Sequence, residues 1–421
     1  MVGLFKETKM QYIVILGAGF GGIRSALELA KQFRNKKDVK ISLVDRRGYQ
    51  LFTPSLYEIA TADEDMTETL PLKKSITVPL ADILKNTGVE IIKGVFTQID
   101  PTNKQVFLES GQKISYDYLV LAQGSTTDYF NIPGALEHSY PLKSLQDALR
   151  IRNQIEFTIQ RNRNDISKKN IRIMIAGGGY TGCEFAAELG NMLKIIAWKN
   201  NYPHEKIEVV ILEAMNKVIF GLDDRLSEDA YNRLDQLGIR IQLSSMITKV
   251  DDGFVELASG EKEAFDLLIW TTGVKALPIP FVGEAQPVDK KERLNTKTCL
   301  QILNSETIFA IGDCACIYNE QGRPVPPTAQ NATQQAQYIA LAIVECMAGR
   351  TPAPFVPKPH GFIVTLGGKW AILKWGNWYA KGFVGYLMRI AADLRYFYNI
   401  VGAWKALKIV LLQTELYSRN D

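Results

Sequence analysis

The chain has 421 residues, of which 46% are hydrophobic and 22% are charged, and its formal net charge at pH 7 is +4. This composition is typical of folded proteins and excludes a disordered, collagen-like or disulfide-stapled chain. At roughly 150 residues per domain, the length predicts two or three domains. No uncharged apolar run reaches the length of a conventional spanning helix, and the small net charge predicts no nucleic-acid partner.

Charge and tryptophan are concentrated at the C-terminal end of the chain. Residues 360–421 hold eight basic and three acidic side chains, so this tail carries +5 while the rest of the chain carries −1. Four of the six tryptophans lie in the same tail. A proline-rich segment, 351–361, precedes it and is typical of a linker. We therefore expect a separate C-terminal region over residues 351–421.

The cysteines and histidines are few. Five irregularly spaced cysteines without a C-x-x-C pair argue against a disulfide framework and favour a reducing compartment. With only three histidines, the sequence predicts no metal site. The apolar residues 12–20 run directly into a glycine loop, which is typical of a strand rather than of a signal peptide.

One pattern of elements occurs twice along the chain. A buried strand over residues 11–16 leads through a glycine turn into a helix over 23–33 and a strand over 40–44, which ends at Asp45. The second copy follows about 160 residues later. It consists of a strand over 171–176, a glycine turn, a helix over 183–193 and a strand over 208–212, which ends at Glu213.

The remaining predicted elements connect and follow these two copies. Apolar strands are expected over residues 116–122, 265–270 and 307–311, and a long helix over 329–347. In the tail, 382–398 and 402–416 are compatible with helices, and Trp404, Leu407 and Leu411 fall on one helical face. Lys408 lies near that face, so the predicted amphipathic character is imperfect.

The two glycine loops predict two nucleotide sites. In each loop the first glycine permits a tight turn, the second lets a pyrophosphate approach the backbone, and the third lets helix and strand pack closely. The helix N-terminus then offers free N–H groups to the phosphates, and an acid at the end of the next strand can bind a ribose diol. The residues are Gly17, Gly19, Gly22 and Asp45 in the first copy, and Gly177, Gly179, Gly182 and Glu213 in the second.

The order of the elements assigns a dinucleotide to each loop. Gly312-Asp313 follows a predicted strand, and we expect Asp313 to stand at a helix start and to accept hydrogen bonds from the ribityl chain of a flavin. A first unit that is closed by such a segment, with a second unit inserted, is the arrangement of FAD followed by NAD. No arginine adjoins Glu213, so we expect the second site to take NADH and to disfavour the 2′-phosphate of NADPH.

At this point the sequence resembles the two-dinucleotide-fold flavoprotein reductases, and within them the type II NADH:quinone oxidoreductases, which are single-subunit and do not pump protons. The broader resemblance is carried by the two glycine loops, by residues 116–125 and by Gly312-Asp313. The narrower one is carried by residues 269–274 (IWTTGV) and by residues 326–334 (PPTAQNATQ).

The resemblance implies roles for particular residues. FAD would be held by Gly17, Gly19, Gly22, Asp45, Gly124, Asp313, Ala329 and Gln330, and NADH by Gly177, Gly179, Gly182, Glu213 and Gly273. Glu184 matches a family glutamate near the nicotinamide and the quinone passage, and Gln330 and Gln334 match a quinone-site motif, so these three would act in catalysis. The fold class would be α/β, with two Rossmann-like dinucleotide-binding domains and a C-terminal membrane-associated helical region.

The implied domains are an FAD-binding domain over residues 1–165 and 285–350, an NADH-binding domain over 166–284 and a membrane-binding region over 351–421. The implied partners are a membrane quinone and the lipid surface, with a homodimer left open. The implied location is peripheral, on the cytoplasmic face of the inner (plasma) membrane.

Three alternatives remain at the level of the sequence. A sulfide:quinone or dithiol-disulfide reductase would need a cysteine pair near the flavin, yet no cysteine precedes Cys183, which we interpret as a packing residue. A flavin reductase with another electron acceptor stays open. So does an NADH-binding sensor, against which the quinone-site motif and the tail argue.

Overall fold

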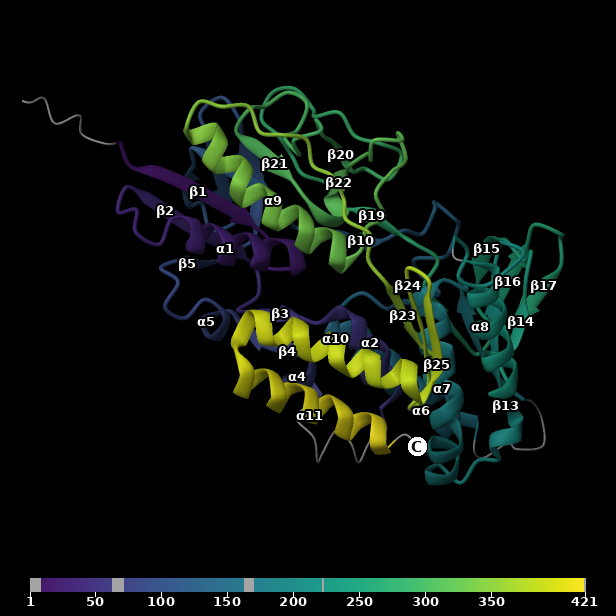
Figure 1. The fold of residues 1–421 in the computed structure, drawn as a ribbon. Helices are drawn as coiled ribbons and strands as arrows, with labels where there is room; N and C mark the ends of the chain where they lie inside the picture. The colour runs from purple at the N-terminus through teal and green to yellow at the C-terminus, as the bar shows by residue number, and fades with distance from the viewer. Residues whose placement is uncertain (1–8, 63–71, 163–169, 222, 420–421) are drawn as a thin grey trace, which may run out of the picture. The chain divides into compact units, whose positions relative to one another are not determined.

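The computed structural model describes residues 9–62, 72–162, 170–221 and 223–419. The chain divides into two compact units, each assembled from three separate segments. The first unit comprises Met1–Leu51, Val78–Thr126 and Val274–Pro359. The second unit comprises Phe52–Thr77, Thr127–Gly273 and His360–Asp421. Figure 1 shows the helices and strands of both units.

A parallel five-stranded sheet forms the centre of the first unit. Its strand order is β21-β9-β1-β2-β5, that is Ile308–Ala310, Tyr118–Leu121, Gln11–Leu16, Val39–Asp45 and Glu90–Lys93. Most of its strand residues are apolar, as expected where helices cover a parallel sheet. Ile13 on β1 lies opposite Ile41 on β2 and Tyr118 on β9, so the ends of these strands meet at one sheet edge. Helices α1 (Phe20–Gln32) and α9 (Ala329–Met347) pack against each other beside this sheet (Figure 1).

Smaller elements complete the first unit. A second sheet, β6-β7-β8, is antiparallel. The bounds of these and the other small elements, which lie wholly or mostly in this unit, are β3 Tyr49–Leu51, β4 Thr77–Pro79, α5 Leu80–Ile83, β6 Phe96–Asp100, β7 Gln105–Leu108, β8 Lys113–Ser115, β10 Ser125–Thr127, β19 Val274–Ala276, β20 Leu294–Asn295, η4 Gly312–Cys314 and β22 Ala315–Cys316.

The second unit repeats the parallel sheet. Its order is β11-β18-β12-β13-β14, that is Tyr140–Pro141, Leu267–Trp270, Ile171–Ala176, Ile207–Leu212 and Arg240–Gln242. Its helices include α6 (Leu145–Asn162), α7 (Tyr180–Lys199) and α8 (Asp224–Gln236), with a short turn η3 at His204–Lys206. The side chain of Asp223 accepts a hydrogen bond from the backbone N–H of Arg225 at 3.0 Å and so caps α8.

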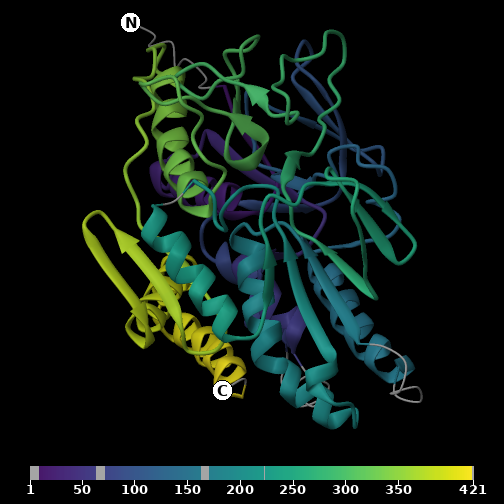
Figure 2. The same cartoon turned by 90° about the vertical axis from the view of Figure 1, so that its right-hand side faces the viewer.

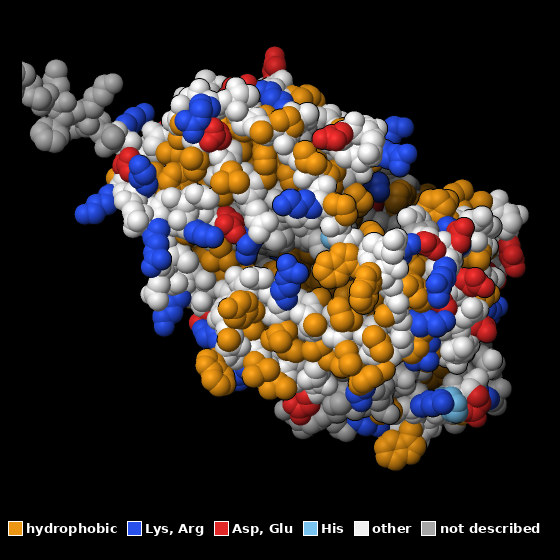
Figure 3. Space-filling view, in the orientation of Figure 1, with side chains coloured by type: hydrophobic (Ala, Val, Ile, Leu, Met, Phe, Trp, Pro, Cys, Tyr) orange, Lys and Arg blue, Asp and Glu red, His pale blue; other side chains and the backbone are white. Residues whose placement is uncertain are grey.

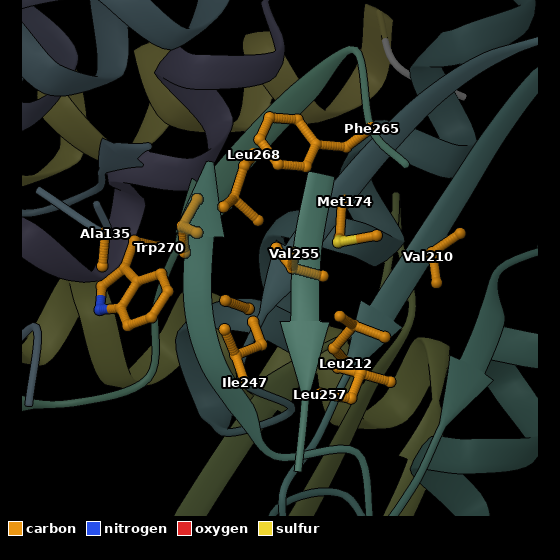
Figure 4. Packing of buried hydrophobic residues seen from close by; sticks show 12 residues of the cluster. Ala135, Met174, Val210, Leu212, Ile247, Val255, Leu257, Phe265, Leu268 and Trp270 are labelled. Atoms are coloured by element: carbon orange, nitrogen blue, oxygen red, sulfur yellow. The ribbon is translucent and has the colours of Figure 1, made fainter. Parts of the chain in front are cut away.

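An apolar core joins this sheet to an antiparallel one. Strands β15 (Ile247–Asp251), β16 (Phe254–Leu257) and β17 (Lys262–Ala264) form the smaller sheet. Their inward side chains pack with those of β12, β13 and β18 in one apolar cluster, and Figure 4 shows the indole of Trp270 beside Ala135 at one edge of it. The indole N–H of Trp270 is not left unpaired by this burial, because it donates to the backbone oxygen of Asp128 at 2.9 Å.

The tail belongs to the core of the second unit. A three-stranded antiparallel sheet is followed by two helices, and the short elements of residues 52–77 pack with them. Figure 2 shows the tail sheet standing beside α8, where Lys374 pairs with Asp223. The bounds are η1 Thr53–Ser55, α2 Leu56–Thr61, α4 Leu72–Ile76, β23 Phe362–Thr365, β24 Ala371–Trp375, β25 Trp378–Gly382, α10 Phe383–Val401 and α11 Ala403–Arg419.

The predicted fold class is confirmed. The strand over 171–176 and the helix over 329–347 have the predicted bounds, and both βαβ units are present. The helix predicted over 183–193 is longer, because α7 begins directly after the second glycine of its loop. The tail helices expected over 382–398 and 402–416 correspond to α10 and α11.

The compact units do not follow the predicted domain limits. Residues 52–77 and 127–165 join the second unit, and the tail joins it as well, because its buried side chains pack there. Sequence motifs mark where nucleotide-binding units begin, whereas compactness depends on contacts between distant segments. The predicted limits at 165, 285 and 350 therefore stay a prediction about nucleotide-binding function.

Candidate functional site

The first glycine loop connects β1 to α1. Gly17 has a φ of +101°, and a Cβ there would lie 2.5 Å from the backbone oxygen of Ala122. A Cβ at Gly22 would lie 1.8 Å from the backbone oxygen of Gly17. In contrast, nothing lies within 4 Å of a Cβ built at Gly19. The first and third glycines are therefore required by packing, while the second leaves open space in front of the helix N-terminus.

Asp45, the last residue of β2, is held against this loop. One carboxylate oxygen accepts the N–H of Ala18 at 2.7 Å and the other accepts the N–H of Arg47 at 2.7 Å. A carboxylate can accept about four hydrogen bonds, so two backbone donors orient Asp45 and leave acceptor capacity for a ribose diol. The predicted geometry of strand, loop, helix and acid is present in the first unit.

Buried polar atoms near the loop indicate that it accommodates a polar group. Both side-chain polar atoms of Gln123 and the Nε of Arg47 are buried without a hydrogen-bond partner in the protein. Gln123 follows Ala122, against which Gly17 packs. Buried polar groups are normally hydrogen-bonded, so these atoms fit a site that a dinucleotide completes. The residues of the first unit therefore fit FAD.

Asp313 lies in a short turn and not at the start of a long helix. The 3-10 helix η4 covers only Gly312–Cys314 with Asp313 in its first turn, so the expected helix start is confirmed, but this helix is a single turn and the next long helix begins at Ala329. Gly312, the first residue of η4, has a left-handed φ of +70°, which glycine adopts without steric cost. Ser125 donates to Asp313 at 2.5 Å, and the N–H of Gly312 donates to Gln335 at 2.7 Å. Ser125 and Gln335 are not among the predicted site residues, although Ser125 ends the segment 116–125 that carries the family resemblance.

The predicted quinone-site residues Gln330 and Gln334 both lie on α9 but have different surroundings. Thr328 caps the helix by accepting the N–H of Asn331 at 3.2 Å, and this places Ala329 and the exposed Gln330 in the first turn. Gln334 is bound elsewhere: its amide donates to the backbone oxygen of Lys358 at 3.1 Å and accepts the N–H of Lys358 at 2.8 Å. Gln334 thus fastens the proline-rich segment to α9, which the spacing of the two glutamines could not predict.

The second glycine loop repeats the first in the second unit. Gly177 has a φ of +99°, and a Cβ at Gly182 would lie 2.0 Å from the backbone oxygen of Gly177. Gly179 again has nothing within 4 Å of a built Cβ. Glu213, directly after β13, accepts the N–H of Gly178 at 2.6 Å and that of Met215 at 2.8 Å. The residues of the second unit therefore fit a second dinucleotide.

Two further glycines of the predicted sites lie at strand ends. Gly124 follows β9 with a φ of +77° and has open space around a built Cβ. Gly273 follows β18, and a Cβ there would lie 3.0 Å from the ring of Phe130. Each stands near the carboxyl edge of the parallel sheet of its own unit, where ligands of such sheets bind.

Glu184 lies in the first turns of α7, behind the second loop. Its carboxylate accepts hydrogen bonds from the hydroxyl of Thr365 at 3.0 Å and from the N–H of Thr365 at 3.3 Å. Glu184 as a whole is partly exposed, but its carboxyl group is buried. Burial raises the pKa of this carboxyl group to about 7, although the positive charge of Arg389 lowers it. A carboxyl group with such a pKa can gain and lose a proton near neutral pH, as acid–base chemistry requires.

A buried ion pair lies near Glu184 in the same unit. Arg389 on α10 pairs with Asp393 at 2.6 Å, donates to Ser55 at 3.3 Å and lies 3.9 Å from Glu58. All four side chains are buried. Arg389 is one of the basic residues of the tail, and the sequence left it only as a possible contact, because no local pattern marks a basic side chain as buried.

The cysteines do not form a redox centre in the described part of the chain. All five are free thiols, and four of them are buried. Cys183 donates to the backbone oxygen of Gly178 at 3.2 Å, and burial raises its pKa well above the ordinary range. These features fit the predicted packing role of Cys183. Among the described residues, no cluster of histidine, cysteine and carboxylate side chains has the arrangement of a metal site.

The exposed surface of the tail is rich in large apolar side chains. In the orientation of Figure 3, hydrophobic side chains gather over the region where Figure 1 draws α10 and α11. Trp404 is 86% exposed and Trp378 is 81% exposed. The other large apolar side chains that are exposed in the tail are Trp375 on β24, Phe383, Val384, Leu387, Met388 and Tyr398 on α10, and Leu407 and Leu411 on α11. Over the described residues, no helix has the length and apolar character needed to cross a bilayer.

Comparison with known proteins identifies the class that this fold and these sites define. The family model of pyridine nucleotide-disulphide oxidoreductases matches residues 11–336. The chain therefore belongs to the pyridine nucleotide-disulphide oxidoreductase family. The prediction of a flavoprotein of this family, similar to the type II NADH:quinone oxidoreductases, is confirmed.

Individual relatives resemble the chain over most of their length. A type II NADH:quinone oxidoreductase of Haemophilus influenzae is 29% identical over 389 residues, which cover 85% of each chain. The demethylphylloquinone reductase NdbB of Synechocystis is 31% identical, with 86% of each chain covered. Among solved structures, NDH2 of Plasmodium falciparum in complex with NADH has the same fold, with a TM-score of 0.83, 20% identity and coverage of 98% of this chain and 99% of that one.

Proposed function

We propose that this protein oxidises NADH through a bound FAD and reduces a membrane quinone to the quinol, without pumping protons. The observation that carries the proposal is the repetition of one binding geometry, glycine loop, helix N-terminus and acid, once in each compact unit. Two such sites accommodate two dinucleotides. The relatives that share most of this chain include enzymes that act on quinones.

Particular residues would hold the two dinucleotides. Gly17, Gly19, Gly22, Asp45, Gly124, Asp313, Ala329 and Gln330 hold FAD, and Gly177, Gly179, Gly182, Glu213 and Gly273 hold NADH. When bound, FAD supplies the redox chemistry that the side chains themselves lack. Glu213 already carries two backbone hydrogen bonds as an anion, so a 2′-phosphate beside it would be repelled and NADH preferred over NADPH.

The protein's own side chains orient the substrates and supply a proton. NADH gives up a hydride, which carries two electrons, and a quinone takes up two electrons and two protons. Glu184 holds a proton near neutral pH and can supply one of these protons, after which solvent replaces it. Gln330, exposed in the first turn of α9, offers an amide donor to a quinone oxygen, whereas the role of Gln334 is to position the segment at Lys358.

The proposed function is tested by anaerobic titration of the purified yellow protein. NADH should bleach the flavin absorbance, and a short-chain quinone should then restore it. NADPH, run in parallel, should need a higher concentration for the same bleaching. Bleaching that a quinone does not reverse would instead support an NADH-binding sensor or a reductase of another acceptor.

We further propose that the tail binds the membrane surface, on the cytoplasmic face where NADH is available. The apolar side chains exposed on α10 and α11 can insert among the lipid head groups, and the exposed Arg395, Lys405 and Lys408 lie on the same helices. At roughly 1 kcal/mol per basic residue near anionic lipid, these charges add to the effect of apolar insertion.

Substitution of Trp404 and Leu411 by serine should weaken binding to vesicles of anionic lipid by at least about tenfold, because burying each such side chain contributes on the order of 1.5–3 kcal/mol. Cosedimentation with the vesicles measures the change. Trp198→Ser is the matched control, since Trp198 is 77% exposed but lies on α7, outside the tail. Equal losses in both variants would contradict docking through the tail.

A further inference from the structure

A chain of two hydroxyl groups ends at the carboxylate of Glu184. The Tyr57 hydroxyl lies 2.6 Å from the Thr365 hydroxyl, and the Thr365 hydroxyl donates to Glu184 at 3.0 Å. Tyr57 is on α2, Thr365 is the last residue of β23 and Glu184 is on α7. Three elements that are far apart in the sequence thus converge on one carboxyl group within the second unit.

The direction of the hydrogen bonds follows from the donors available. When Glu184 is ionised it can only accept, so the one hydroxyl hydrogen of Thr365 is donated to Glu184, and Tyr57 is then the donor to Thr365. The backbone N–H of Thr365 donates to the same oxygen of Glu184 at 3.3 Å. Every one of these donors favours the ionised form of Glu184, since a carboxylate can only accept.

Both side chains of this hydrogen-bond chain, Tyr57 and Thr365, are buried. Tyr57 is 3% exposed and Thr365 is 2% exposed, so water does not replace a hydroxyl that is removed from either side chain without rearrangement. Burial, followed by the charge of Glu58, raises the pKa of Tyr57 well above its ordinary value. Tyr57 therefore stays protonated and remains a donor over the working range of pH.

The charged and titratable groups around Glu184 come from three elements. On α10, Arg389 favours the carboxylate and Asp393 opposes it. On α7, Tyr180 and Cys183 are neutral at ordinary pH, since burial raises the pKa of Tyr180 to about 12 and that of Cys183 higher still. On α2, Tyr57 interacts with Glu184, and Glu58 lies beside it. The hydroxyl and the backbone N–H of Thr365 are neutral groups that donate directly to Glu184, and Tyr57 hydrogen-bonds to that hydroxyl.

We propose that Tyr57 and Thr365 are positioning residues for Glu184, whose hydroxyl chain holds the carboxylate in one orientation and sets how tightly it binds a proton. This inference rests on the proposed function only in assigning Glu184 to proton supply. Because both hydroxyls favour the anion, their removal makes Glu184 bind its proton more tightly. The direct donor, Thr365, has the larger effect, and Tyr57 acts through it.

The test is an infrared titration of the protonated carboxyl band of Glu184 in the full-length holoprotein, assigned by its loss in Glu184→Gln. Thr365→Val keeps the shape of the side chain and should raise the titration midpoint by about one pH unit. This corresponds to a proton dissociation constant that is about tenfold smaller. Tyr57→Phe should raise it by less. Thr365→Ser, which restores the hydroxyl, should return the midpoint to that of the unaltered protein.

Controls separate positioning from a general loss of structure. Thr248→Val removes an exposed strand hydroxyl that bonds only to the backbone oxygen of Glu256, and it should leave the midpoint unchanged. The double variant Tyr57→Phe with Thr365→Val leaves no buried hydroxyl unpaired, so it should keep the raised midpoint while recovering stability. An unchanged midpoint in Thr365→Val and Tyr57→Phe, or a failure of Thr365→Ser to restore it, would overturn the proposal.

The same variants also test the proposed role of Glu184 independently. If Glu184 supplies a proton, the pH dependence of kcat with a short-chain quinone should move together with the infrared midpoint. A midpoint that moves while the kinetic profile stays in place would support the hydroxyl chain and refute proton supply by Glu184. The two ideas therefore fail in different measurements.

Discussion

Replacement of Gly179 by valine should abolish NADH oxidation while the protein stays folded and yellow. The backbone at Gly179 is extended, with a φ of −74°, and nothing lies within 4 Å of a built Cβ. Valine therefore fits the folded chain, but its side chain fills the space in front of the α7 N-terminus where a pyrophosphate would approach. Misplacing a substrate by about 1 Å can cost 100-fold, so we expect a loss of about 100-fold or more in kcat/KM for NADH.

The first loop offers a matched variant. Gly19 has a φ of −77° and equally open surroundings, so Gly19→Val should also fold, but it should lose FAD and the yellow colour. Flavin absorbance of the purified protein and NADH kinetics distinguish the two results. Loss of FAD from Gly179→Val, or NADH turnover that survives it, would contradict the assignment of the two loops.

Gly182, the third glycine of the second loop, is unsuitable for this test because its surroundings are closely packed. A Cβ at Gly182 would lie 2.0 Å from the backbone oxygen of Gly177 and 2.7 Å from the hydroxyl of Thr271. Gly182→Ala would therefore disturb the packing of loop and helix, and a loss of activity there would report on folding. Gly179 and Gly19 are the positions at which ligand binding is separated from packing.

Replacement of Arg389 by leucine should destabilise the protein strongly, by about 3–5 kcal/mol at neutral pH, because it leaves the carboxylate of Asp393 buried without its partner. Glu58, 1% exposed, also lies near the guanidinium. Urea unfolding followed by tryptophan fluorescence measures the change. Replacing both Arg389 and Asp393 by leucine should recover part of the loss, since no charge of the pair then remains buried.

The effect of Arg389→Leu should depend on pH in a defined direction. Burial raises the pKa of Asp393, and Arg389 opposes that rise. A carboxyl group whose pKa is higher in the folded state stabilises the fold at low pH and loses this contribution as the pH rises through the folded pKa. Without Arg389 the rise is larger, so the variant should be least stable at about pH 8 and approach the unaltered protein near pH 4. A difference that is constant with pH would contradict this account.

These contacts make the tail a structural part of its unit as well as the proposed membrane-binding surface. Thr365, Arg389 and Asp393 all lie beyond Pro359 and are buried against Tyr57, Ser55 and Glu58. Truncation after residue 359 would expose that core and leave Glu184 without its donors. Substitution of exposed side chains such as Trp404 is therefore the sharper test of membrane binding.

Much of the fold could be predicted from local pattern. Short apolar runs that end in a glycine loop and then an acid predicted both parallel sheets, because such a strand must be buried and its loop has few alternative uses. Gly17 and Gly177 were identified correctly as turn residues, and both have a left-handed φ. The pattern of a glycine and an acid after a strand placed Asp313 at a helix start but did not predict that this helix, η4, ends at Cys314.

The candidate site was predictable only where its chemistry is local. Asp45 and Glu213 contact residues of their own βαβ units, so their spacing along the chain carries the information. Gln330 and Gln334 are four residues apart on α9, and this spacing predicted a common site. Gln334 hydrogen-bonds to the backbone of Lys358 instead.

The sequence by itself determined the two nucleotide-binding units, their glycine loops and acids, and the basic, aromatic character of the tail, because each depends on residues near one another in the chain. Only the tertiary structure decided that part of the tail packs into the core of the second unit and that Tyr57, Thr365 and Arg389 lie near Glu184. Tyr57, Thr365 and Arg389 each lie more than a hundred residues from Glu184 in the sequence. Their hydrogen bonds form because burial leaves each polar group few partners, and burial is a property of the folded chain as a whole.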